Sequence, residues 1–168
     1  MKLGKAILVA GILAFAPAAF AQQPASGSDP IINYSDDDQA MNKAVADARA
    51  RLGYFWEREK AKARNESDFA LKVAIPTTSP GGPRYEHIWV ENISRSGDGF
   101  AASLANEPGW LRGLHNGDRV EFTENMISDW GFYRGDKMIG FYTVRVMLPD
   151  MPAKDAAEIR AMLGENPK

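Results

Sequence analysis

Cysteine is absent from all 168 residues of this chain. Without a thiol the chain cannot carry the lipid of a bacterial lipoprotein, form a disulfide or build a zinc site from thiolates. A domain of this size can bury about two-thirds of the surface that its unfolded chain exposes. Its stability therefore has to come from packing and hydrogen bonding.

An excess of positive charge is also missing. The formal net charge is −2, whereas a protein that binds nucleic acid through its phosphates presents a basic stripe. The basic residues between Arg58 and Arg64 alternate in part with Glu57 and Glu59, as is typical of the solvated end of a helix. We therefore expect no nucleic-acid partner.

Signatures of catalysis are scarce too. No serine lies in a G-x-S-x-G elbow, no glycine-rich segment has the Lys of a phosphate-binding loop, and no two histidines have H-x-x-x-H spacing. The sequence thus predicts no metal site, no cofactor and no evident nucleophile.

The N-terminal residues, in contrast, form a recognisable pattern. Two lysines precede an apolar run over residues 6–15, Pro17 ends the run, and Ala19-Phe20-Ala21 is a small-x-small cleavage site. The run is shorter than the roughly 20 apolar residues that span a bilayer, and no later segment reaches that length. A secretory signal peptide is the prediction, and an uncleaved membrane anchor is the alternative.

This pattern divides the chain into three parts. We expect a signal peptide over residues 1–21, a flexible leader over 22–34 and a single domain over 35–168. The location that follows is the periplasm or the extracellular medium, with no membrane span left after cleavage.

The predicted domain starts with a long amphipathic helix. Ser35 is the expected N-cap, acidic residues follow in the first turn, and apolar residues recur at helical spacing from Met41 to Trp56. Gly53 weakens this helix without having to end it.

Alternation of apolar and polar residues then predicts strands, which turn residues separate. The expected strands are 69–75, 85–93, 100–104 and 119–123, and the outgoing strand of a hairpin about Arg134-Gly135-Asp136 places Tyr142, Val144, Val146 and Leu148 on one face. A short C-terminal helix begins at Pro152 and stops at Gly164. The predicted fold is α+β: an antiparallel sheet of five or six strands, the long N-terminal helix packed on one face, and the short C-terminal helix.

Two residues are candidates for catalysis. His87 shares a strand face with Trp89, whereas Glu86 points the other way and is poorly placed to orient a histidine base. Asp129 lies at a predicted turn, where an Asp most often accepts backbone N–H bonds. As a catalytic acid it needs a carboxylate or histidine brought close by folding, so a structural role is favoured for both candidates.

Four tryptophans stand out in a domain of this size: Trp56, Trp89, Trp110 and Trp130. At least two are expected to fill the space between helix and sheet, while an exposed one could stack on a sugar or anchor a protein. Trp110 follows loop-forming residues and is the best candidate for exposure.

Several short motifs occur along residues 37–148 in a defined order. They are Glu86-His87-Ile88-Trp89, the turn over residues 94–99 with Phe100 after it, Asn106-Glu107-Pro108, Gly117-Asp118-Arg119-Val120, Ile127-Ser128-Asp129-Trp130 and Gly140-Phe141-Tyr142-Thr143-Val144-Arg145. This ordered set resembles the YegJ-like proteins, a bacterial domain of unknown function. The resemblance implies a small α+β domain, often exported, and brings no activity or cofactor. The motif side chains and Trp110 give the candidate binding residues Trp89, Asn106, Trp110, Trp130, Tyr142 and Arg145.

Three functional hypotheses follow. The favoured one is a non-catalytic periplasmic binding or protein-interaction module whose partner is an envelope protein or a secreted toxin. The alternative is a hydrolase of an envelope polymer that uses Asp129 or His87. The third is a small-ligand binder in which loops 77–83 and 105–117 close over one face of the sheet.

Overall fold

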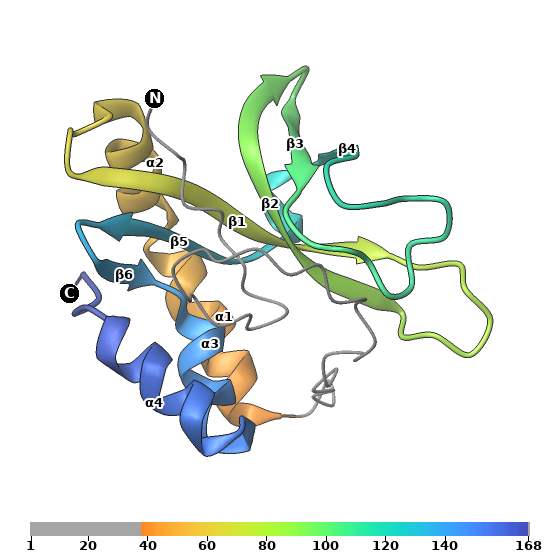
Figure 1. The fold of residues 1–168 in the computed structure, drawn as a ribbon. Coiled ribbons are helices and arrows are strands. Elements are labelled where there is room, and N and C mark those ends of the chain that lie inside the picture. The colour runs from red at the N-terminus through yellow and green to blue at the C-terminus, as the bar shows by residue number, and fades with distance from the viewer. Residues whose placement is uncertain (1–37, 168) are drawn as a thin grey trace, which may run out of the picture.

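A computed structural model describes residues 38–167 of the chain, so the expected signal peptide, leader and Ser35 cap lie outside the described residues. The elements, in order, are α1 (Gln39–Ala50), α2 (Leu52–Ala61), β1 (Glu66–Pro76), β2 (Tyr85–Ser96), β3 (Gly99–Leu104), β4 (Arg119–Phe122), η1 (Glu124–Met126), β5 (Ile127–Arg134), β6 (Lys137–Gly140), α3 (Tyr142–Met147), η2 (Leu148–Asp150) and α4 (Ala153–Met162). The predicted α+β class is confirmed (Figure 1).

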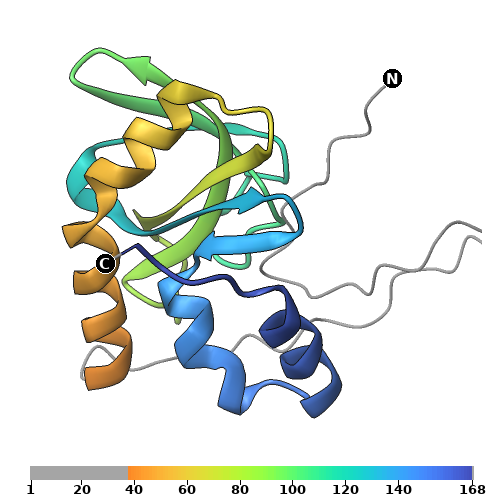
Figure 2. The same cartoon turned by 90° about the vertical axis from the view of Figure 1, so that its left-hand side faces the viewer.

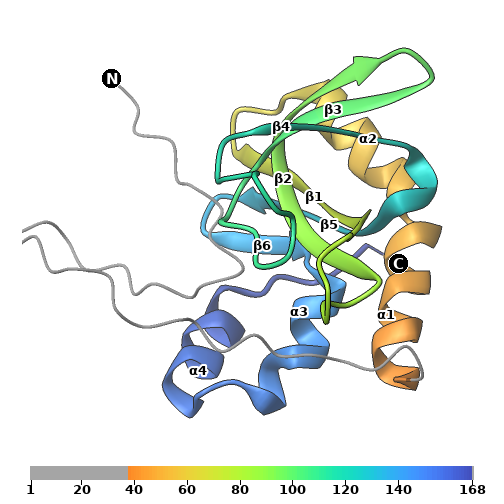
Figure 3. The ribbon, with the colours of Figure 1, turned by 90° about the vertical axis from the view of Figure 1, so that its right-hand side faces the viewer.

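The six strands form one antiparallel sheet in the order β4-β3-β2-β1-β5-β6. Figures 2 and 3 show α1 and α2 along one side of this sheet and α4 on the other, with α3 between them. The buried side chains accordingly form two clusters, one around Phe55 and Trp130 under α1 and α2, the other around Trp89, Phe141 and Ile159. None of the helices in residues 38–167 combines the length and apolarity that crossing a bilayer requires.

The N-terminal helical segment is divided. Asp38 caps α1 by accepting the N–H of Met41, and the helix ends at Arg51, whose backbone leaves the helical region at φ −112° and ψ 14°. A second helix, α2, starts at the next residue and changes direction (Figure 2). The break falls beside Gly53, the residue with the lowest helix propensity in the segment, and the Arg51 guanidinium donates to the carbonyl of Pro167.

The segment after β6 corrects one prediction. Residues 142–148, expected as a strand with Tyr142, Val144, Val146 and Leu148 on one face, form α3 and the start of η2. Their β-branched and aromatic residues favour a strand. Left-handed backbone at Gly140 (φ 88°) and Phe141 (φ 53°) nevertheless ends β6, and the next residues then turn into a helix.

The sheet is split at one end. Strands β1 and β2 pair over 71–76 and 85–90. Beyond that point each strand has a bulge in its pairing with its other neighbour, and Asp68 and Asn92 both adopt a left-handed φ of 54°. Asp and Asn tolerate this conformation better than most residues. The β2–β3 hairpin therefore turns away from β1 (Figure 1).

Candidate functional site

Asp129 lies in the interior of the protein, with none of its surface exposed. Its carboxylate accepts backbone N–H bonds from Trp130 (2.8 Å), Tyr142 (3.1 Å) and Thr143 (2.8 Å), and a bond from the Thr143 hydroxyl (2.7 Å). Two of these N–H groups open α3, whose orphan donors a carboxylate satisfies well. Asp129 of β5 is therefore the cap of a helix that starts 13 residues later.

A lysine lies beside this carboxylate on the same face of the sheet. Lys72 of β1 is in register with Trp89 on one side and Asp129 on the other. Its ammonium donates to the Thr143 hydroxyl at 3.3 Å and lies 5.9 Å from the centre of the Trp89 ring. Burial lowers the pKa of Lys72, and the Asp129 charge opposes that shift. Burial also raises the pKa of Asp129, against the hydrogen bonds of Thr143 and the charge of Lys72.

His87 is exposed and lies on β2, two residues before Trp89, the neighbour of Lys72. Its Nδ1 lies 2.9 Å from the hydroxyl of Ser128. That hydroxyl donates to the carbonyl of Lys72, and a serine has only one proton to donate, so Nδ1 of His87 is the donor. Glu86 turns its carboxylate to loop 105–117, where it accepts the N–H groups of Gly109 (2.6 Å) and Trp110 (2.8 Å).

The two loops of the ligand-binding hypothesis do lie together. The Ser79 hydroxyl donates to the carbonyl of Trp110, and Gly82 lies so close to the Trp110 ring that a Cβ would stand 2.7 Å from it. Trp110 is half-buried. Asn106 is half-buried too, and its side-chain oxygen has no hydrogen-bond partner within residues 38–167. Two hollows elsewhere in residues 38–167 are lined by neither loop.

The remaining candidate binding residues are built into the fold. Trp89 and Trp130 are 1% and 0% exposed, and the Trp130 indole donates to the carbonyl of Ala48 in α1. Tyr142 packs edge-on against Trp130, and burial raises its pKa to about 12. Arg145 donates to the carbonyls of Gly140 and Gly164 and to the Asn166 side chain, which ties the C-terminal segment to β6.

A surface that the sequence did not single out lies between α2 and the diverging strands. We name this surface the α2 groove. Its residues come from α2 (Trp56, Glu59 and Lys60), β1 (Asp68 and Phe69), β2 (Glu91, Asn92, Ile93, Ser94 and Arg95) and β3 (Phe100). It contains two hollows of about 250 and 290 Å³, and Glu59 and Ile93 line both, so the hollows adjoin.

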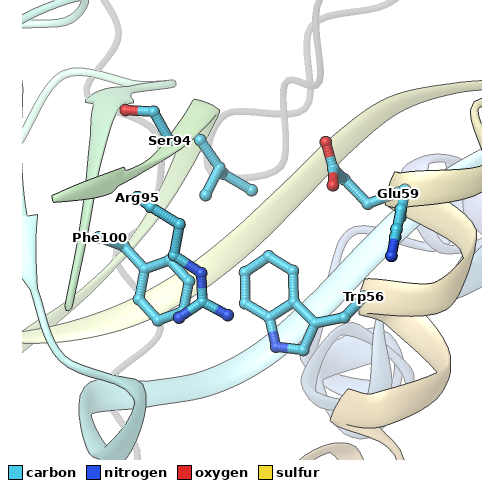
Figure 4. A pocket seen from close by; sticks show the side chains of 7 residues that line it. Trp56, Glu59, Ser94, Arg95 and Phe100 are labelled. Atoms are coloured by element: carbon cyan, nitrogen blue, oxygen red, sulfur yellow. The ribbon is translucent and has the colours of Figure 1, made fainter. Parts of the chain in front are cut away.

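An aromatic and cationic stack forms one end of the α2 groove (Figure 4). The rings of Trp56 and Phe100 are parallel within 6°, with centroids 4.9 Å apart. The Arg95 guanidinium lies 4.4 Å from the Phe100 ring centre and 5.8 Å from that of Trp56. A guanidinium held by its face against a ring keeps its N–H edge free for another acceptor. Arg95 is exposed, so this edge can be reached from solvent.

Charge changes along the α2 groove. Arg95 and Lys60 line the hollow with the ring stack, Asp68 and Glu91 line the other hollow, and Glu59 lies between them and lines both. Within the part of the chain that the structure describes, the side chains of Glu59, Lys60 and Glu91 form no ion pair. Their charges are therefore available to a ligand. No group of three His, Asp or Glu side chains in residues 38–167 is arranged to hold a metal ion.

Comparison with known proteins gives a family for the chain. A family model described as an uncharacterised protein conserved in bacteria (DUF2314) matches residues 38–165. The chain is 33% identical over 159 residues to the uncharacterised protein YegJ of Escherichia coli K12, covering 95% of this chain and 97% of that protein.

A second relative is longer. A protein of Neisseria meningitidis serogroup B, named for ankyrin repeats, is 31% identical over 142 residues, which are 81% of this chain and 56% of that protein. The chain thus spans about half the length of this relative. No solved structure matches the chain.

Proposed function

The chain belongs to this family of bacterial proteins, as the order of its motifs predicted, and we propose that it is an exported, non-catalytic module that binds another protein in the cell envelope. The observation that carries the proposal is the state of Asp129. Both of its oxygens are occupied by hydrogen bonds from the protein itself, and neither is exposed. Asp129, the carboxylate that the sequence offered as a catalytic candidate, is thus used to cap α3.

Hydrolysis of an envelope polymer requires more than this arrangement offers. Glycoside chemistry uses two carboxyl groups on either side of the bond that is cut. A lysine, Lys72, acts on the Asp129 carboxylate, and His87 is engaged with Ser128. These contacts favour the binding module over the hydrolase.

Two further observations support protein binding. The α2 groove presents a partly exposed Trp56 and an exposed Arg95, two residue types that often anchor protein partners. One relative is named for ankyrin repeats, and repeats of that kind stack into extended binding surfaces. The export part of the proposal rests on the signal-like pattern of residues 1–21.

Photocrosslinking in the native host tests this function. A photoreactive p-benzoylphenylalanine replaces one exposed residue at a time, with Lys60→p-benzoylphenylalanine on α2, Arg112→p-benzoylphenylalanine in loop 105–117 and Lys154→p-benzoylphenylalanine on α4. We expect one position to give a discrete adduct with another protein in the envelope fraction, while the others give none. Absence of an adduct at every position, or clearing of a peptidoglycan gel by the purified protein, contradicts the proposal.

A further inference from the structure

The α2 groove lies where the sheet opens. Residues 66–70 of β1 keep β5 as their neighbour, and residues 91–96 of β2 keep β3. Between them the β1–β2 pairing has ended. Two strand edges thus face the gap, and no strand of residues 38–167 lies between them.

Unpaired strand edges are sites at which another chain can add. Proteins usually shorten, cover or charge such edges, because their free N–H and C=O groups pair with any extended segment. Partner proteins use the same geometry in β-augmentation, in which main-chain bonds give affinity and pockets for alternate side chains give specificity. The α2 groove has both features: two edges and two adjoining hollows.

The wall on the α2 side is held in place. Arg58 of α2 and Arg134 of β5 both pair with Glu66 at the start of β1, at 2.9 Å each. Glu66 is only 9% exposed, so this double ion pair fixes α2 against β1. A groove whose walls are fixed in advance loses less freedom on binding than one formed by mobile loops.

We propose that the α2 groove binds an extended segment of a partner protein, which adds to the open strand edge and places an acidic side chain at Arg95 and a basic side chain at Glu59, Asp68 and Glu91. This inference rests on the protein-binding function proposed above and names the kind of partner. Arg95 can fork onto a carboxylate while its face stays on Phe100. The three carboxylates of the other hollow fit a Lys or Arg.

The spacing of the two side chains follows from strand geometry. Side chains on one face of a strand recur every second residue, about 6.8 Å apart. The segment therefore carries its acidic and basic residues an even number of positions apart, on the same face. Neither side chain is effective without the main-chain bonds that hold the segment extended.

A displayed library of random decapeptides, selected on the purified protein, is the probe for this site. We expect enriched peptides to share the acidic and basic pair at that spacing. Arg95→Glu should weaken binding of the selected peptide about tenfold or more, the effect of about 1.4 kcal/mol. The matched control is Arg84→Glu, because Arg84 also lies over a ring, that of Tyr85, at 5.3 Å, but in the β1–β2 loop. It should leave the affinity unchanged.

Two measurements separate strand addition from simple charge attraction. Methylation of alternate backbone nitrogens of the peptide should abolish binding, because it removes the donors of the added strand. The amides of residues 91–95 should also exchange more slowly with the peptide bound. Binding of the methylated peptide, or binding that leaves the exchange of residues 91–95 unchanged, overturns the inference.

Other outcomes also contradict the inference. If no peptide is enriched, or if Arg95→Glu leaves the affinity unchanged, the α2 groove is not the binding site. An adduct in the photocrosslinking scan would still support the proposed protein-binding function. Dimerisation that protects residues 91–95 without peptide would assign the groove to a second copy of the chain instead.

Discussion

Replacing Asp129 by Asn should destabilise the protein rather than abolish a reaction. The substitution preserves the shape of the side chain and exchanges one carboxylate oxygen for an NH₂ group, which donates and cannot accept. In the wild-type protein each oxygen of Asp129 accepts two hydrogen bonds. The first oxygen accepts the N–H groups of Trp130 and Tyr142, and the second accepts the N–H and the hydroxyl of Thr143. Asn can keep one of these two pairs.

The size of the effect follows from the pair that is lost. A hydrogen bond to a charged group contributes about 1.5–3 kcal/mol, and a buried N–H left without an acceptor costs about 1–3 kcal/mol. The Thr143 hydroxyl can rotate to accept from the new amide, which offsets one bond. Removing a buried charge also returns part of its desolvation cost. We therefore expect a net loss of about 2–4 kcal/mol, out of the 5–15 kcal/mol that is usual for a domain.

Urea unfolding followed by tryptophan fluorescence measures this loss, since Trp130 is buried next to Asp129. Asp136→Asn is the matched control, because Asp136 lies exposed in the β5–β6 turn, and a surface change of this kind stays within about 0.5 kcal/mol. Wild-type stability in Asp129→Asn would refute the capping role and return the residue to the list of catalytic candidates.

Two further substitutions test the same region. Burial lowers the pKa of Lys72 from its ordinary 10.5. The folded protein therefore binds this proton less readily than the unfolded chain, and stability rises with pH between the lowered pKa and 10.5. Lys72→Met should flatten that rise in urea midpoints measured from neutral to alkaline pH, and an unchanged slope would contradict the lowered pKa. Gly140→Ala combines a φ of 88° with a Cβ placed 2.4 Å from the Trp130 carbonyl and should cost at least about 3 kcal/mol. In the control Gly135→Ala, with a φ of 62° and open space around the Cβ, only the left-handed cost of about 1–2 kcal/mol applies. Equal midpoints for the two glycine variants would contradict the close approach at Gly140.

Local pattern was sufficient for most of the sheet. The alternation from Phe69 to Ile75 predicted β1, and the strands expected over 85–93 and 100–104 correspond to β2 and β3. Both signals act between residues that are near in sequence. Helix α3 could not be predicted in this way, because its sequence favours a strand and its cap is supplied by Asp129 from another element. Tertiary hydrogen bonding overrode the local preference there.

The α2 groove was missed for a related reason. It depends on two bulges in different strands, and neither leaves a strong mark in the sequence. A weak signal was present: Asp68 and Asn92 stand at positions where the alternation shifts, and both types tolerate left-handed backbone. That signal indicates where a strand bends, but the distance between the two bends is fixed only by the fold.

Two of the motifs that relate this chain to its family, residues 127–130 and 140–145, meet at one junction in the structure. Asp129 caps α3, Trp130 joins β5 to α1, and Arg145 donates to the carbonyl of Gly140. Together these contacts hold β5, β6, α1 and α3 in place. Because the motif residues stabilise the fold, loss of binding in a motif variant says nothing of the binding site unless its stability is measured as well. Arg95 is exposed and lies outside this junction, so a change there that alters binding and leaves stability intact identifies the surface that meets the partner.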